Sequence, residues 1–341
     1  MQVHDLFNRT DHLAALGFAQ DPDGRDVAVA LLKATWRFSA AGGTPVTARD
    51  DQRIPIFLGD RFAGDPAESP LLAASELTCN KLGTDIAMSG HAYGWGLEEA
   101  TAGFRLGSLE KALRVHGARS VAPVMHRYAV GHAHPFDKVS VGYENAYGGK
   151  WLGPHGQLLP YPMNAVGKGA YCPDAGTQAP HLELPNLTYP GPNLAGLEPA
   201  ALGFIPAGWQ QRARFAGTFD ADWMENRRPL LPKNFDPRFY NTVAQDQVLR
   251  GGLQGGEELT LLGLHAQAKV IRLRIPHYCC TAEFVVRASK QCIPMVADTL
   301  LVLPDEGKLA VTFRASLPLN VDIRYLRSVT VAEALVGGRS S

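Results

Sequence analysis

The clearest pattern along the chain is an alternation of apolar and polar positions in its C-terminal third. In residues 269–276 (KVIRLRIP), Ile271, Leu273 and Ile275 fall on one face of an extended chain, whereas Val270 and two arginines fall on the other. This period of two predicts a half-buried β-strand. Two apolar runs flank PDEGK at residues 304–308, which predicts a hairpin turn between them, so we expect antiparallel β-structure throughout this third.

Similar signals occur in the N-terminal part. Residues 27–38 (VAVALLKATWRF) lie between two turn-forming segments and predict a strand. Residues 104–119 predict two paired strands around a loop at 107–110, with a single helix over 109–115 as the alternative. Residues 71–81 fit either one short helix or a strand that enters a turn.

Residues 203–247 form the densest cluster of aromatic, glycine, proline and acidic residues in the chain. Prolines at four positions prevent any helix long enough to align the aromatic side chains on one face. The high aromatic content argues against disorder. We therefore expect an ordered, irregular segment that serves recognition, in which Trp209, Trp223 and the neighbouring arginines have the composition of protein-interface hot spots. Burial of both tryptophans in the core is the alternative.

These signals together predict a mainly β protein, because strand patterns recur along the chain and long helical periodicity does not. We expect two packed antiparallel subdomains, each a β-sandwich or barrel-like, with long ordered loops and few short helices. The expected boundaries are residues 1–125 for the N-terminal subdomain and 126–336 for the C-terminal subdomain, which includes the segment 203–247. Residues 337–341 are expected to be a disordered tail.

Composition narrows the classes of partner. The 341 residues contain 33 basic and 33 acidic side chains, so no overall charge attracts nucleic acid or an anionic membrane. The first sixteen residues carry charged and polar side chains where a signal peptide has its apolar core, and no apolar run approaches the roughly 20 residues of a membrane-spanning helix. We therefore expect a cytoplasmic protein that binds neither nucleic acid nor membrane.

The cysteines and histidines give no metal or disulfide signature. The five cysteines, Cys79, Cys172, Cys279, Cys280 and Cys292, are odd in number and lack CxxC spacing, and the adjacent pair is expected to be two buried thiols in a strand. Four histidines lie near one another in sequence, namely His116, His126, His132 and His134. A metal site is one interpretation, but no carboxylate separates the last two and HExxH spacing is absent, so solvated or hydrogen-bonded histidines are favoured. No cofactor is expected.

Two further motifs have residue types that occur in catalytic or nucleotide-binding sites. Asp220 and Asp222 at a spacing of two, with Asp236 nearby, could form the acidic site of a carbohydrate-active or metal-dependent hydrolase. Capping and pairing with nearby arginines is the commoner role of such carboxylates. Residues 164–171 (NAVGKGAY) resemble a phosphate-binding loop only in part, because Gly169 occupies the position that needs Ser or Thr.

A set of ordered motifs resembles a known group of proteins. YENAYGG, NAVGKGAY, LPNL, GFIPAGWQQR, AGTFDADW, RPLLPKNFDPRFYN, AQDQ and GGEELTL occur in this order, and VALLKATWRF and NKLGTDIAMSGHAYG precede them. Together they resemble type VI secretion-associated proteins long classed as a domain of unknown function, and the resemblance covers nearly the whole chain.

The resemblance implies a cytosolic adaptor or chaperone that binds a toxic effector and helps load it onto the VgrG or PAAR spike, without a catalytic reaction. A hydrolase at the acidic cluster and a structural component of the spike are the two alternatives. The candidate partner-binding and motif positions are Tyr143, Gly148, Gly149, Asn164, Gly167, Lys168, Trp209, Arg212, Gly217, Thr218, Asp220, Trp223, Pro232, Phe235, Asp236, Gln245 and Asp246.

Overall fold

The structure is a computed structural model that describes residues 5–124, 127–153, 155–170, 182–191 and 198–334, and most of its regular structure is β-strand. The α-helices within those ranges are only α1 (Gln210–Ala213) and α2 (Ala221–Asn226). The mainly β class with few short helices is thus confirmed. The sheets are open rather than closed into barrels.

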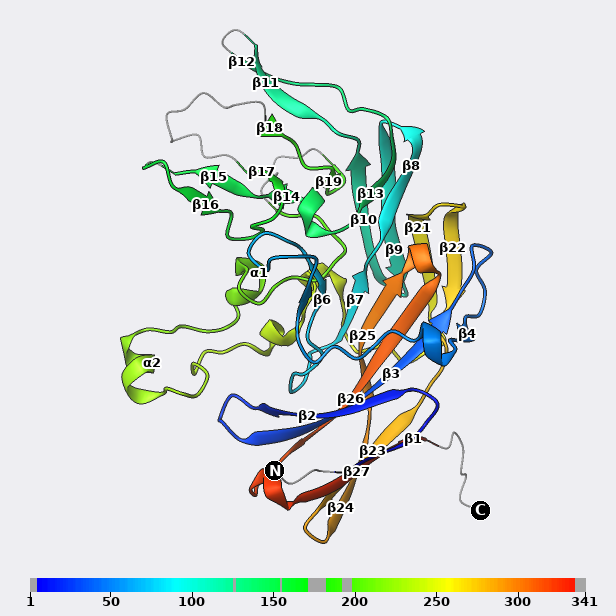
Figure 1. Cartoon of the computed structure of the whole chain (residues 1–341), viewed down its shortest axis with the longest axis vertical. Helices are drawn as coiled ribbons and strands as arrows, with labels where there is room; N and C mark the ends of the chain where they lie inside the picture. Colours follow the sequence, from blue (N-terminus) through cyan, green and yellow to red (C-terminus); the bar gives the residue numbers. More distant parts are fainter. Residues whose placement is uncertain (1–4, 125–126, 154, 171–181, 192–197, 335–341) are drawn as a thin grey trace.

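A central sheet of seven strands forms the middle of the molecule (Figure 1). Its order is β2 (Leu13–Gln20), β3 (Asp26–Arg37), β26 (Lys308–Pro318), β25 (Val296–Leu303), β7 (Thr84–Met88) and β20 (Val248–Leu249), and β4 (Val46–Thr47) also pairs with β3. All neighbours are antiparallel except β25 and β7. β3 is buried along almost its whole length, which explains its continuous apolar sequence.

Two further sheets pack around the central one. The five-stranded sheet has the order β19 (Leu187–Thr188), β10 (Leu109–His116), β9 (Glu99–Leu106), β21 (Glu258–His265) and β22 (Ala268–Arg274). The four-stranded sheet, at the bottom of Figure 1, has the order β1 (Asp5–Arg9), β27 (Leu326–Glu333), β23 (Cys280–Val286) and β24 (Ser289–Pro294). One apolar core joins all three sheets.

Small sheets complete the fold. They are β12 (Arg127–Val130) with β11 (Ser120–Val124) and β18 (Leu182–Glu183), β13 (Phe136–Ser140) with β8 (His91–Leu97), β14 (Tyr147–Gly148) with β17 (Lys168–Gly169), β15 (Lys150–Leu152) with β16 (Leu158–Pro160), and β5 (Arg61–Phe62) with β6 (Leu71–Ala73). Most of them lie at the upper left of Figure 1, where they border the irregular segments.

The expected boundary at residues 125/126 does not separate the sheets. The central sheet pairs β3 with β26, and β1 pairs with β27, so strands from both ends of the chain share the same sheets. Local sequence patterns do not report such pairings, because the partners are separated by hundreds of residues. The expected tail at residues 337–341 lies outside the described residues.

Several local predictions are confirmed and two are corrected. Residues 99–116 form the β9–β10 hairpin with Gly107 at φ +57°, so the alternative helix is wrong. Residues 304–306 form a turn between β25 and β26 that ends in left-handed Gly307, as expected. Residues 71–81 contain only the three-residue strand β6. Cys280 is buried but Cys279 is exposed, because adjacent residues in an extended chain point to opposite sides.

No helix within the described residues combines the length and apolar character that crossing a bilayer requires.

Candidate functional site

The YENAYGG and NAVGKG motifs pack against each other through backbone contacts. Asn164 is fully buried, and its Nδ2 donates to the carbonyl oxygens of Tyr143 (2.8 Å) and Tyr147 (3.0 Å). The Lys168 N–H donates to the Ala146 carbonyl at 2.9 Å, so the two motifs form the parallel pair β14–β17. An amide side chain with both donors satisfied can hold two irregular segments together.

The glycines of these motifs permit this close approach. Gly149 has φ +102°, and a Cβ there would lie 2.6 Å from the Gly167 carbonyl oxygen. A Cβ on Gly167 or Gly148 would also collide with neighbouring backbone. The Lys168 Nζ donates to Asn186 Oδ1 at 3.1 Å, as a structural contact rather than part of a phosphate-binding loop. These motif positions hold backbone in place.

Trp209 and Arg212 are buried, contrary to the expectation of an exposed recognition surface around them. The Trp209 ring packs edge-on against Tyr143 with centroids 5.5 Å apart. Arg212 donates from Nη1 to the Ile205 carbonyl at 2.8 Å and from Nη2 to the Phe239 carbonyl at 3.0 Å. Burial lowers the pKa of the Arg212 guanidinium. Their positions leave them no surface for a partner.

Gln245 and Asp246 lie in a short 3₁₀ turn (Gln245–Gln247) beside the five-stranded sheet. Asp246 Oδ1 accepts from the buried Lys111 Nζ at 2.8 Å, and its Oδ2 accepts from the Tyr189 hydroxyl at 3.2 Å. Gln245 and Asp246 also line an open pocket of about 190 Å³. The AQDQ motif therefore supplies the counter-charge for a buried lysine.

Residues 216–236, which we call the arm, carry α2 away from the sheets, to the left in Figure 1. At its base Gly217 has φ +85°, and a Cβ there would lie 2.7 Å from the Cβ of Pro232. Thr218 and Asn234 bond reciprocally across the base, through Thr218 N–H to Asn234 Oδ1 (3.0 Å) and Asn234 Nδ2 to Thr218 Oγ1 (2.9 Å). The turn geometry at the base of the arm is thus set by the arm's own residues.

The interior of the arm is ordered by specific bonds. Asp220 caps α2 by accepting from the Trp223 N–H at 2.9 Å. The Trp223 Nε1 donates to the Leu230 carbonyl at 2.8 Å, and Arg227 Nη2 donates to the Pro22 carbonyl at 3.0 Å, in the turn after β2. Phe235 packs with its neighbours Phe239 and Tyr240 where the arm rejoins the body.

The outer side of the arm exposes large apolar side chains. Phe219 is 53% exposed and Met224 is 60% exposed, and the Phe219 ring packs edge-on against Trp223 with centroids 4.8 Å apart. An exposed phenylalanine and methionine on a rigid support are typical of interface anchors. The candidate positions predicted from the sequence included Trp223 but neither Phe219 nor Met224, although both lie in the same FDADWM motif and within the segment 203–247 that was expected to serve recognition.

The three carboxylates of the hydrolase alternative each have a structural partner. Asp220 caps α2, Asp222 Oδ1 accepts from Asn226 Nδ2 at 2.7 Å, and Asp236 pairs with Arg238. The Arg238 hydrogen bond lowers the pKa of Asp236. Asp220 and Asp222 line an open pocket of about 220 Å³ on the arm, but Asp236 is not part of its wall.

The histidines do not converge in the described structure. His116 is buried, with Nδ1 3.0 Å from Glu99 Oε1 and Nε2 3.2 Å from Thr188 Oγ1, while His132 and His134 are exposed. His126 lies outside the described residues, as does Cys172. Among the residues that the structure does describe, no group of three or more His, Cys, Asp or Glu side chains could hold a metal ion.

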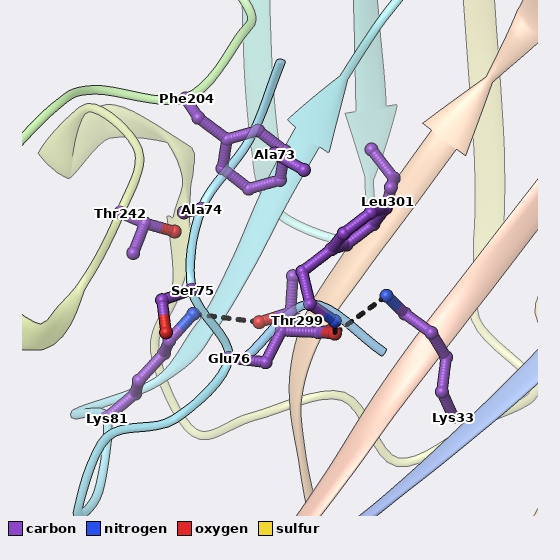
Figure 2. A pocket seen from close by; sticks show the side chains of 11 residues that line it. Lys33, Ala73, Ala74, Ser75, Glu76, Lys81, Phe204, Thr242, Thr299 and Leu301 are labelled. Carbon is purple, nitrogen blue, oxygen red and sulfur yellow. Dashed lines mark hydrogen bonds and ion pairs between the residues drawn. The ribbon is translucent and has the colours of Figure 1, made fainter. Parts of the chain in front are cut away.

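A buried layer of ion pairs was not expected from the sequence. Lys33 Nζ lies 2.9 Å from Glu76 Oε2, Lys81 Nζ lies 2.7 Å from Asp85 Oδ2, and Arg314 pairs with Asp298. Figure 2 shows Lys33, Glu76 and Lys81 around a cavity of about 10 Å³, room for one water molecule. The cavity is too small for a substrate, so this layer anchors the segment before β7 to the central sheet. Lys33, in the middle of an apolar strand, was the one feature of the sequence that indicated this buried layer.

Comparison with known proteins gives one match. No curated protein matches the chain, and no solved structure does. A family model described as "Uncharacterized protein conserved in bacteria (DUF2169)" matches residues 23–314. Because this match spans most of the chain, including the motif pair, the arm and the buried ion pairs, the protein belongs to the DUF2169 family of bacterial proteins.

Proposed function

We propose that this protein is a cytosolic adaptor that binds a type VI secretion effector and promotes its loading onto the VgrG or PAAR spike. The observation that carries the proposal is the arm, which presents Phe219 and Met224 to solvent on an ordered support. The motif resemblance supplies the secretion context.

The arm has the physical properties of a preorganised binding element. Its helix cap, the Trp223–Leu230 bond and the contact of Arg227 with the body fix its conformation before any partner arrives. Binding therefore costs little ordering entropy. Burying the exposed parts of Phe219 and Met224 contributes about 1 to 2 kcal/mol each.

The alternatives have weaker support. A hydrolase at Asp220, Asp222 and Asp236 requires converging carboxylates, whereas those groups cap turns or pair with neighbouring side chains. A structural spike component predicts that the protein leaves the cell with the secreted particle. Fractionation of secreted and cytosolic pools distinguishes that function from an adaptor, which stays in the cytosol.

The test is co-purification with the effector, VgrG and PAAR proteins of the same bacterium. We expect the native chain to retain the effector and the double variant Phe219→Ser/Met224→Ser to bind it at least tenfold more weakly, because two anchors are lost. The control is Val46→Ser/Leu158→Ser, which removes apolar side chains of 66% and 67% exposure outside the arm.

Equal binding by the arm variant and the control would show that the arm is not the binding element. Failure of the native chain to bind any of these proteins, with effector solubility unchanged by its absence, would refute the adaptor function itself.

A further inference from the structure

β2 is the terminal strand of the central sheet, and its sequence lacks the usual protection of an edge strand. LAALGFAQ contains no charged residue and no proline over eight residues. Its one strand neighbour within the described residues is β3. Long, uncharged edge strands are templates for pairing with another chain, which most proteins prevent.

Both faces of β2 are packed against apolar residues. Ala14 and Leu16 contact the main core, and Ala15 and Ala19 contact a second apolar cluster that includes Val27. A strand with apolar residues on both faces is typical of the interior of a sheet. β2 therefore has the composition of an interior strand but the position of an edge strand.

The hydrogen-bond pattern shows which backbone groups point outward. The Leu319 N–H donates to the Asp26 carbonyl at 2.7 Å, so the backbone groups of Asp26 point toward β26 and those of Val27 toward β2. Val27 lies opposite Ala19, and every second residue of β2 from Ala19 pairs with β3. The intervening residues direct their N–H and C=O groups to the open edge.

Ala14 and Leu16 belong to this outward set, and their backbone groups have no hydrogen-bond partner among the residues described. At the end of the strand the carbonyl of Gln20 accepts from the Cys79 thiol at 3.2 Å. The open part of the edge thus consists of the backbone groups of Ala14 and Leu16, in the N-terminal half of β2.

The other long edges carry protection that β2 lacks. β24 has Lys290 within it and Pro294 at its end. β22 carries Lys269 and Arg272, and the Gly43 N–H already occupies the Arg272 carbonyl at 2.8 Å. Charges and prolines are the devices that block strand addition, so their absence is confined to β2 among these three edges.

We propose that the open edge of β2 accepts an extended, uncharged apolar segment of another protein, which joins the central sheet as an additional strand. The occupant must be extended because the free groups of Ala14 and Leu16 are backbone donors and acceptors that follow one another along a strand. It must be uncharged because its side chains lie beside apolar flanks where an unpaired charge is costly.

A second copy of this chain is a less suitable occupant. Two rigid copies that meet only along β2 form a contact well below the roughly 1,200 Å² that stable interfaces bury. A flexible segment follows the edge without that limit. This docking site goes beyond the proposed function, because it lies outside the arm and does not depend on secretion.

The probe is a synthetic peptide with the uncharged sequence of residues 27–32 (VAVALL), with two lysines at each end that lie outside the paired part and keep it in solution. This is the part of β3 that already pairs with β2, so it is complementary to the strand. Two control peptides carry N-methyl groups on alternate amides, in the two possible phases. Strand addition uses one edge of the peptide, so we expect one phase to lose binding at least tenfold and the other to retain it.

Hydrogen exchange of the full chain reports the site directly. We expect the amides of Ala14 and Leu16 to exchange fast in the free protein and at least tenfold more slowly with the peptide. Ala14→Pro removes one outward N–H and should weaken peptide binding at least tenfold, whereas Cys292→Pro, on the edge strand β24, should not. If Ala14→Pro does not fold, the exchange rates of the Ala14 and Leu16 amides in the native chain still show whether the peptide pairs with this edge.

Protected Ala14 and Leu16 amides in the free monomer would overturn the proposal, as would equal binding by both N-methylated peptides. A concentration-dependent dimer that protects these amides would assign the edge to a second copy instead. Loss of effector binding in the arm variant with normal peptide binding would leave the β2 site intact, so the two proposals fail separately.

Discussion

Replacing Asn164 with alanine tests whether the motif pair is held by this one buried amide. The substitution removes both donors, which leaves the carbonyls of Tyr143 and Tyr147 without their bonds to Asn164. The Tyr143 carbonyl keeps its bond from the Ala146 N–H at 3.2 Å, so the cost is that of two lost hydrogen bonds, about 0.5 to 1.5 kcal/mol each. With the small cavity that remains, we expect Asn164→Ala to lower the free energy of unfolding by about 2 to 4 kcal/mol.

The assay is thermal unfolding followed by tryptophan fluorescence, since Trp209 packs against Tyr143 beside the site. A loss of this size lowers Tm by roughly 5 to 15 °C for a domain of a few hundred residues or less. The matched control is Asn234→Ala, which removes an amide on the exposed base of the arm, where water can replace it. We expect the control to lose about 1 kcal/mol or less.

Asn164→Asp separates the lost hydrogen bonds from the lost volume. Aspartate keeps the size of the side chain but places a carboxylate oxygen where the donors were, against two carbonyl oxygens. We expect at least as large a loss as for alanine at neutral pH. A variant Asn164→Asp as stable as the native chain would refute the reasoning, because the cavity alone would then explain the alanine result.

Three further outcomes follow from buried ionisable groups. Burial lowers the pKa of His12, so on acidification the unfolded state takes up the histidine proton at a higher pH than the native state does. The contribution of His12 to the free energy of unfolding is therefore complete above about pH 6.5 and falls as the pH drops below that value. His12→Gln should flatten this part of the stability–pH profile. Burial raises the pKa of Cys280 to about 12, so a thiol reagent should label exposed Cys279 but not Cys280 in the native chain, as mapped by mass spectrometry. Lys33→Met leaves Glu76 as an unpaired buried charge and should cost about 3 to 5 kcal/mol in chemical denaturation, with partial recovery in Lys33→Met/Glu76→Gln.

Local patterns predicted the elements of the fold well where one face of a strand is buried. The alternation in residues 269–276 corresponds to β22, in which Ile271 and Leu273 are buried and Arg272 and Arg274 are exposed. The arrangement of the sheets was beyond such patterns. The parallel pairs β1–β27 and β25–β7 join segments hundreds of residues apart, and no local feature of either strand records its partner.

The buried ion pairs show the same limit for the candidate site. Glu76 lies in a segment with no regular structure, and nothing near it in sequence indicates that it compensates Lys33, 43 positions away. The histidines show the converse: they are close in sequence, but His116 is bonded to Glu99 and Thr188 while His132 is exposed. Proximity in sequence is weak evidence for a shared site when the chain is extended and its strands diverge.

The distribution of motifs has a physical explanation that bears on where binding occurs. Irregular backbone cannot satisfy its own polar groups, so it needs particular side chains such as Asn164 and Arg212 at fixed positions. Such positions are rich in pattern but buried. A binding anchor needs only to be apolar, exposed and rigidly held, and Phe219 and Met224 meet that requirement because Asp220 and Trp223 fix the helix beneath them. Within residues 203–247 the residues of the recognisable motifs therefore build the support, and under the proposed function the contact with a partner is made by their less distinctive neighbours Phe219 and Met224.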